Sequence, residues 1–133
     1  MLVDRVCEGY FSAATRTNQP EVVGAFREVL RACSGAALGH ATQSVLVDRT
    51  SILDQLGELA IPTLFVASTD DAGIRMDVAQ ATAGRINEVQ FEVVEGAGHL
   101  TPLERPQAFN MLLRSFLADD DAGVSAAPES TED

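Results

Sequence analysis

Apolar positions recur at helical spacing through the first part of the chain, and this periodicity predicts helix over residues 1 to about 38. Pro20 and Glu21 suit the first turn of one such helix. A stretch of small residues, 34–39, interrupts the pattern. A weaker amphipathic segment follows over residues 44–59, and we expect a break in it near residues 48–51. The residues predicted to share one face of the first segment are Val22, Val23, Phe26, Val29 and Leu30.

The pattern changes at Ile61, where an almost unbroken apolar run extends to Ala67. Such a run predicts a strand buried on both faces, as in a parallel sheet. A helix is predicted from about Met76 to Ile86, and a second strand over Val89–Val94. Pro106 opens a final helix, whose apolar side chains follow the helical period. The order strand, helix, strand, helix predicts an α/β fold, with two parallel strands joined by a right-handed crossover.

Charge and composition narrow the class of protein. The 133 residues include 20 acidic and 9 basic side chains, and all the basic ones are arginine, so the net charge is -11. This balance argues against nucleic acid or an anionic membrane as a partner. No apolar window is long enough to span a bilayer, and the first residues lack the signal-peptide pattern, so we expect a cytoplasmic protein. Residues 118–133 are acidic and poor in apolar side chains, which predicts a disordered tail.

Candidate chemistry lies where the two predicted strands end. Asp70 and Asp71 follow the first strand, and His99 follows the second in a glycine-containing turn. The carboxyl ends of neighbouring parallel strands meet at one edge of a sheet, so a carboxylate there can accept a hydrogen bond from Nδ1–H of the imidazole and fix its tautomer. Nε2 is then left to act as a general base. The alternative is that the aspartates cap a helix and that His99 is an ordinary loop histidine. The other histidine, His40, has no carboxylate nearby in sequence, and a structural role without catalytic function is favoured for it.

Two long stretches carry a family resemblance: residues 61–71, and residues 91–100 with their continuation through Pro102–Pro106 into the final helix. They resemble the last third of the α/β-hydrolase fold, in its branch of enol-lactonases, esterases and epoxide-hydrolase-like proteins. The resemblance implies that Asp71 is the acid of a catalytic triad, with Asp70 as second choice, and that His99 is the base. Ser68 stands where the family usually has glycine.

The nucleophile that this family needs is missing from the sequence. There is no Gly-x-Ser-x-Gly elbow, and Ser34, Ser44 and Ser51 lack its surroundings. Cys33 has nothing nearby that marks an activated thiolate, and its distance from Cys7 in sequence supports neither a metal site nor a disulfide framework. The histidine-glycine loop of the oxyanion hole is also absent.

Residues 1–48 resemble instead the helical cap that family members insert before their last strands. The expected organisation is therefore a cap-like segment over 1–48, the C-terminal part of a hydrolase domain over 49–117, and the tail.

These observations predict a truncated or split hydrolase that is inactive as this chain alone. Completed by the other half, it is expected to hydrolyse a small ester or lactone with side chains only and without a cofactor. Because two strands make a small sheet, we also expect self-association or a complementing chain. The alternative is a non-catalytic remnant that binds a small apolar molecule or another subunit.

Overall fold

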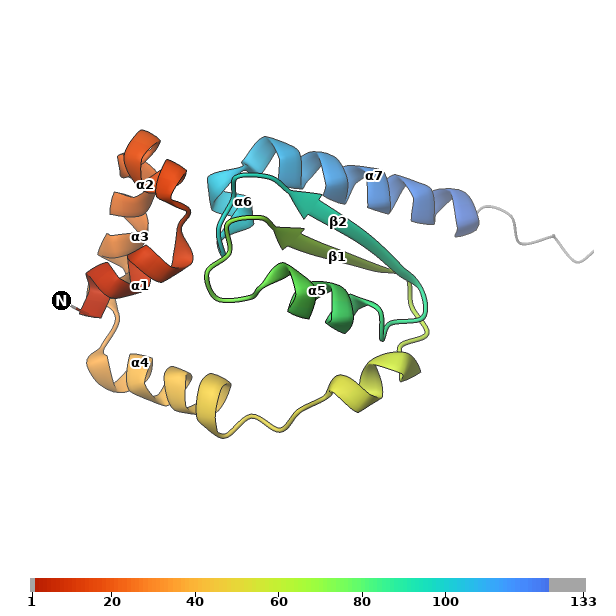
Figure 1. Ribbon diagram of the computed structural model, residues 1–133, viewed down its shortest axis with the longest axis horizontal. Helices are drawn as coiled ribbons and strands as arrows, with labels where there is room; N and C mark the ends of the chain where they lie inside the picture. The colour runs from red at the N-terminus through yellow and green to blue at the C-terminus, as the bar shows by residue number, and fades with distance from the viewer. Residues whose placement is uncertain (1, 125–133) are drawn as a thin grey trace, which may run out of the picture.

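The computed structural model describes residues 2–124 and has two parts, a set of helices at the N-terminus and an α/β unit (Figure 1). The helices at the N-terminus lie at one end of the strand pair. The chain then passes along the lower side of the view in Figure 1 before it enters the first strand. The predicted fold class, α/β with a preceding helical segment, is confirmed. The first group of elements is α1 (Leu2–Tyr10), α2 (Ala13–Asn18), α3 (Pro20–Ala32) and α4 (Gly35–Thr42).

The first three helices pack around a small apolar core. Cys7, Phe11 and Val23 are buried in it, and Phe26 meets Phe11 edge to face with 5.3 Å between ring centroids. Pro20 occupies the first turn of α3, as the sequence predicts, because its missing N–H has no partner there in any helix.

The stretch of small residues, 34–39, follows a short break after α3, and most of it is helical. It forms α4, because the hydroxyl of Ser34 accepts a hydrogen bond from the backbone N–H of Ala37 and so caps the new helix.

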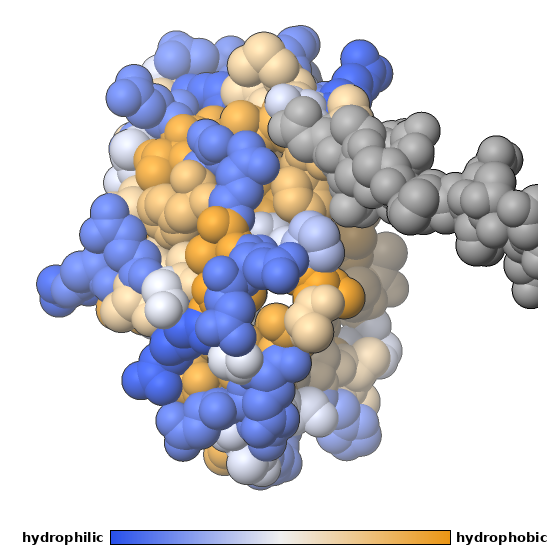
Figure 2. Space-filling model, turned by 90° about the vertical axis from the view of Figure 1, so that its right-hand side faces the viewer, coloured by the Kyte–Doolittle hydropathy of each residue, from blue (hydrophilic) through white to orange (hydrophobic). Residues whose placement is uncertain are grey.

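The segment that joins the helices to the sheet is thinly packed. A π-helical turn (Gln43–Val47) continues α4, and a short 3₁₀ helix, η2 (Leu53–Glu58), follows the break predicted near residues 48–51. From residue 43 to residue 61 every side chain is exposed except Leu56 and Leu59, which are half-buried. Apolar surface also lies open among polar residues on the face in Figure 2.

The two strands pair in parallel, with α5 (Met76–Ala83) between them in sequence and on one side of them in space. β1 (Thr63–Ser68) and β2 (Val89–Val94) pair so that Phe65 lies beside Phe91, and the two rings stack with 5.7 Å between centroids. β1 is not buried on both faces over its whole length: Thr63–Val66 is half-buried, and only its last two residues are buried. Among the described residues no other strand pairs with β1.

The final helix is longer than the sequence predicts. The short α6 (Thr101–Glu104) precedes α7 (Pro106–Val124), which lies on the other side of the strands from α5 in Figure 1. Residues 118–124, assigned above to the disordered tail, are therefore helical, and residues 125–133 lie outside the described residues. No helix in the described part of the chain is both long and apolar enough to cross a membrane.

Candidate active site

The structure brings Asp71 and His99 together beyond the carboxyl ends of the strands. Oδ2 of Asp71 lies 2.9 Å from Nδ1 of His99. The other oxygen of Asp71, Oδ1, accepts hydrogen bonds from the backbone N–H groups of Gly73 and Ile74, at 2.7 and 3.1 Å. The carboxylate is thus held on one side by the turn that follows β1, and it presents its other oxygen to the imidazole.

The surroundings of Asp71 favour its charged form. Its side chain is largely buried, at 10% exposed, and burial by itself raises the pKa of a carboxyl group. The hydrogen bonds from His99, Gly73 and Ile74 together outweigh the burial, so the pKa of Asp71 is lowered from its ordinary value of 3.8. The ionised carboxylate can therefore accept a hydrogen bond from Nδ1–H of His99, an arrangement that leaves Nε2 of a neutral imidazole unprotonated.

Of the two candidate acids, Asp71 is the one that contacts the histidine. The Asp70 carboxylate accepts a hydrogen bond from the Thr69 hydroxyl instead, and its backbone N–H donates to the carbonyl of Ala97. Asp70 therefore helps to hold the turn before His99 but does not orient the imidazole. His40 lies exposed on α4, away from any such arrangement.

The turn before His99 needs glycine at two places. Gly96 has a φ of 68°, a left-handed conformation that disfavours other residues. Gly98 lies against the N-terminal helices so closely that an added Cβ would be 2.6 Å from the backbone nitrogen of Ser12. The sequence indicated that these glycines form a tight turn, but it did not indicate that the turn packs against residues almost ninety positions earlier.

Glu104 connects the histidine turn to the N-terminal helices. Its side chain is 1% exposed, and each oxygen accepts one backbone hydrogen bond of 2.9 Å, from Gly98 and from Ser12. Arg105 adds bonds to the carbonyl of Gly96 at 2.7 Å and to the hydroxyl of Thr15 at 3.5 Å. Sequence reasoning placed Glu104 within the family resemblance but gave it no role.

The end of α1 also contacts His99 directly. The carbonyl of Tyr10 accepts hydrogen bonds from the backbone N–H groups of His99 and Leu100, at 2.9 and 3.3 Å. The Tyr10 ring lies 5.1 Å from the imidazole, centroid to centroid. Sequence reasoning missed this contact because the spacing along a helix does not reveal which distant loop packs against its end.

Ser68 and Thr101 complete the support beneath the histidine turn. The hydroxyl of Ser68 donates to the carbonyl of Gly98 at 2.6 Å, and Thr101 donates to the same carbonyl at 3.3 Å and to Ser68 at 3.2 Å. The serine that replaces the usual family glycine therefore has a structural role, because it ties the end of β1 to the turn that carries His99. Both side chains are buried.

Beside the Asp71–His99 pair lies a hollow of about 150 Å³ at the end of β1. No hydroxyl or thiol of the described residues bonds Nε2 of His99. Cys33 is exposed after α3, and the hydroxyl of Ser34 caps α4. No group of three or more histidine, cysteine, aspartate or glutamate side chains suited to a metal ion occurs among residues 2–124.

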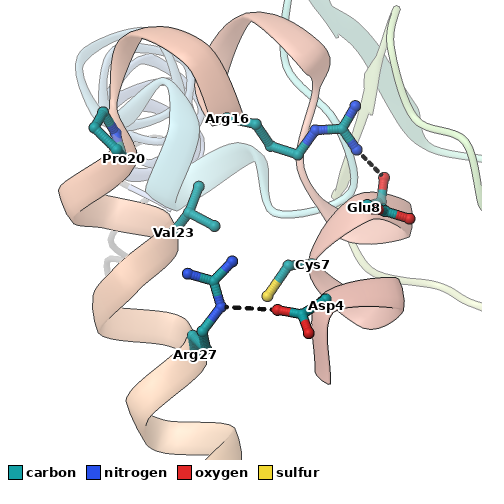
Figure 3. Close-up of a pocket in the computed structure, with 7 residues that line it drawn as sticks. All are labelled: Asp4, Cys7, Glu8, Arg16, Pro20, Val23 and Arg27. Atoms are coloured by element: carbon teal, nitrogen blue, oxygen red, sulfur yellow. Dashed lines mark hydrogen bonds and ion pairs between the residues drawn. The ribbon is translucent and has the colours of Figure 1, made fainter. Parts of the chain in front are cut away.

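A larger pocket, of about 460 Å³, lies between α1, α2 and α3 (Figure 3). Its lining includes four charged side chains, those of Asp4, Glu8, Arg16 and Arg27. Arg27 lies 3.3 Å from the carboxylate of Asp4, and Arg16 donates to the carbonyl of Glu8 at 2.7 Å. Its lining includes no part of the Asp71–His99 pair, so this pocket is not the candidate active site.

Comparison with known proteins identifies the class that this fold and site define. No protein-family model matches the chain. 3-Oxoadipate enol-lactonase 2 of Acinetobacter baylyi is 30% identical over 111 residues, which cover 80% of this chain and 41% of that enzyme. A thermophilic esterase from Thermogutta terrifontis superposes with a TM-score of 0.78 at 28% identity, over 89% of this chain and 43% of the esterase. Est816 is described as an N-acyl homoserine lactone degrading enzyme. It superposes with a TM-score of 0.71 at 29% identity, over 83% of this chain and 44% of the Est816 chain.

The chain therefore belongs to the α/β-hydrolase family and has part of its fold. Its relatives include enol-lactonases and esterases. The chain spans less than half the length of these relatives.

Proposed function

We propose that this chain supplies the acid and the base of an α/β-hydrolase site that cleaves carboxylic esters or lactones. The observation that carries the proposal is the 2.9 Å contact between Oδ2 of Asp71 and Nδ1 of His99, with Asp71 held by two backbone N–H groups. The relatives named as an enol-lactonase and an esterase support the substrate class.

In this proposal Asp71 fixes the tautomer of His99, and Nε2 takes the proton from a serine hydroxyl as its oxygen attacks the ester carbonyl. The resulting imidazolium gives that proton to the leaving alkoxide when the carbon–oxygen bond breaks. Water then releases the acyl group by the same proton transfers. Since the sequence has no serine elbow, the nucleophile belongs to a complementing segment outside this sequence.

The surface supports a complementing segment beside the strands. No described strand covers the second edge of β1, and Ile61, just before the strand, is 61% exposed. An uncovered strand edge with apolar side chains nearby is prone to pair with another chain. For the chain alone we expect self-association in sedimentation velocity; a monomer at all concentrations would count against an exposed pairing edge.

The tautomer of His99 tests the proposal without a nucleophile. Long-range ¹H–¹⁵N NMR of the full chain near pH 7.5 is expected to show His99 with its proton on Nδ1 and Nε2 bare. Asp71→Asn removes the acceptor charge and is expected to abolish this preference, whereas the neighbouring Asp70→Asn leaves it unchanged. Loss of the preference in both variants, or in neither, would refute the assigned acid.

Hydrolysis of p-nitrophenyl acetate is the second test. The chain alone is expected to give no turnover above that of His99→Ala, because two of the three triad functions cannot form an acyl intermediate. Turnover that disappears in both His99→Ala and Asp71→Asn would support the pair but overturn the need for an external nucleophile.

A further inference from the structure

Two peptide units lead into the candidate base, and hydrogen bonds hold both of them. In the first unit, the carbonyl of Ala97 accepts a backbone N–H from the turn after β1 at 3.0 Å, and the N–H of Gly98 donates to Glu104 at 2.9 Å. In the second unit, the N–H of His99 donates to the carbonyl of Tyr10 at 2.9 Å. The remaining group is the carbonyl of Gly98, which receives its hydrogen bonds from side-chain hydroxyls.

Ser68 makes the shorter of the two hydroxyl contacts to that carbonyl. Its hydroxyl, at the last residue of β1, donates to the carbonyl of Gly98 at 2.6 Å, and its side chain is 6% exposed. The hydroxyl of Thr101 has one proton, which lies within reach of the same carbonyl at 3.3 Å and of the Ser68 oxygen at 3.2 Å. Since a hydrogen bond weakens as it lengthens, Ser68 is the main donor to the carbonyl of Gly98.

The packing of the helices explains why this position needs a restraint. Residue 98 must be glycine, because a Cβ there would lie 2.6 Å from the backbone nitrogen of Ser12. In Figure 1 both strands point toward the N-terminal helices, which is where this close approach occurs. Glycine has no side chain to limit rotation of its own backbone, and here it directly precedes His99. Rotation at Gly98 would swing the imidazole, and the bond from Ser68 opposes that rotation.

The same segment that holds the carbonyl of Gly98 also carries the candidate acid. Ser68 stands three positions before Asp71. Between them, the hydroxyl of Thr69 accepts a hydrogen bond from the N–H of Gly96 at 2.9 Å, which joins the two turns. The bond from Ser68 extends this join to the residue next to the histidine. Residues 68–71 therefore hold the base twice, through the backbone before it and through its Nδ1.

We infer that Ser68 is a positioning residue for the candidate base, whose hydroxyl holds the peptide unit of Gly98 and His99 so that Nδ1 stays on Oδ2 of Asp71. The inference rests on the proposed function, because it concerns the same pair. It goes further by assigning to Ser68 an effect on the hydrogen bond of the imidazole, exerted through Gly98 and without contact with reacting atoms. The glycine that the family usually has at this position would provide no such restraint, since it has no hydroxyl.

Exchange of the Nδ1 proton of His99 with water measures how firmly the imidazole is held. It is followed by NMR of the full chain, under the conditions of the tautomer test. Ser68→Ala removes the hydroxyl and is expected to speed this exchange about fivefold, the factor that one hydrogen bond typically contributes. No acceleration in Ser68→Ala would overturn the inference.

A hydroxyl at the other end of β1 provides the matched control. Thr63 donates to the carbonyl of Ile61 at 3.1 Å, and Thr63→Val removes that bond while it keeps the shape of the side chain. This variant is expected to leave exchange at Nδ1 unchanged. Backbone N–H groups of α7 report on general unfolding in the same spectra. Equal acceleration by Thr63→Val, or equal acceleration at α7 in Ser68→Ala, would show a loss of stability without a positioning role, and the inference would be wrong.

Ser68→Cys keeps the test decisive if Ser68→Ala does not fold. A thiol has nearly the size of the hydroxyl but is a weak donor, so exchange at Nδ1 is again expected to be faster than in the parent. Exchange equal to that of the parent would contradict the inference.

The parent chain and Asp71→Asn separate this test from that of the proposed function. If His99 of the parent carries no proton on Nδ1, or if Asp71→Asn leaves that proton unaffected, the proposed function fails and the role of Ser68 fails with it. If both behave as expected while Ser68→Ala and Ser68→Cys match the parent, the Asp71–His99 pair stands and only the role of Ser68 is refuted.

Discussion

Two regions connect the helical segment to the α/β unit: a buried contact around Glu104 and the exposed stretch of chain over residues 43–61. The contact around Glu104 is buried, and it joins residues about ninety positions apart through hydrogen bonds to backbone groups. The covalent connection, residues 43–61, is almost entirely exposed, and the hydrogen bonds that reach it, from Arg85 to Asp54 and from Asn87 to Gly57, lie at the surface. The position of the helices relative to His99 is therefore set by side chains distant in sequence, and the peptide connection contributes little to it.

The comparison also shows where polar groups can be used inside the fold. Around the histidine turn, Glu104 and Ser68 are buried, and each is fully engaged with backbone partners. In the connecting segment the apolar side chains Val47 and Ile52 are exposed instead. Buried polar contacts of this kind fix one geometry, because any shift leaves a donor without a partner. The hydrogen bonds that reach the connecting segment, from Arg85 to Asp54 and from Asn87 to Gly57, are exposed, so water can replace a lost partner there.

The largest effect is expected from removing the buried carboxylate. Glu104→Ala leaves the backbone N–H groups of Ser12 and Gly98 buried without acceptors, which we expect to cost about 3 kcal/mol of unfolding free energy. Urea denaturation followed by circular dichroism measures it. Glu58→Ala, at an exposed position of the connecting segment, is the control and should change stability by less than about 0.5 kcal/mol. Similar losses for both variants would remove the contrast between the regions.

A pair of glycine variants is expected to change stability in opposite directions. In Gly98→Ala the new Cβ would lie 2.6 Å from the nitrogen of Ser12 and 3.0 Å from the backbone carbon of Phe11, so we expect a loss of about 2 kcal/mol. Gly39→Ala places a methyl group in open space within α4 and is expected to stabilise by about 0.5 kcal/mol through helix propensity. Thermal unfolding of the two variants shows whether each one is stabilised or destabilised relative to the parent. A stabilised Gly98→Ala would show that the helices do not lie close to the turn.

A smaller, pH-dependent effect is expected from Asp71→Asn. The pKa of Asp71 is lowered in the folded chain, so its ionised form stabilises the fold above the ordinary value of 3.8. That contribution is lost as the pH falls below 3.8 through the folded-state pKa. We expect the variant to be less stable than the parent at pH 7, and the difference in unfolding free energy to shrink below pH 3.8. Acid titration of unfolding measures this; a difference independent of pH would contradict the carboxylate's role, and Asp70→Asn is the matched control.

The smallest effect is expected in the connecting segment. Val47 is 66% exposed, so Val47→Ser removes little buried surface and should change the unfolding free energy by less than about 0.5 kcal/mol. A loss above about 1 kcal/mol in chemical denaturation would mean that this segment packs more tightly than its exposure indicates.

Sequence periodicity located the long elements because their patterns are local. The helix from Pro106, both strands and the parallel α/β order follow from repeats that lie within each element. The meeting of Asp71 and His99 could also be predicted, since parallel strands end at one edge. The placement of α1 against the histidine turn could not, because it depends on Glu104 and Gly98, whose partners are about ninety residues away. The extent to which β1 is buried could not be predicted either, because it depends on which elements pack against the strand, and the apolar run itself does not reveal them.

The bridge formed by Glu104 has a mechanical consequence. Because buried bonds hold the helical segment at the histidine turn, we expect that cutting the backbone near residue 50 leaves the two pieces associated, with Glu104 still bonded to both Ser12 and Gly98. Separation of the pieces requires those buried bonds to break together. The exposed path through residues 43–61 would then be dispensable for holding the helices against the histidine turn.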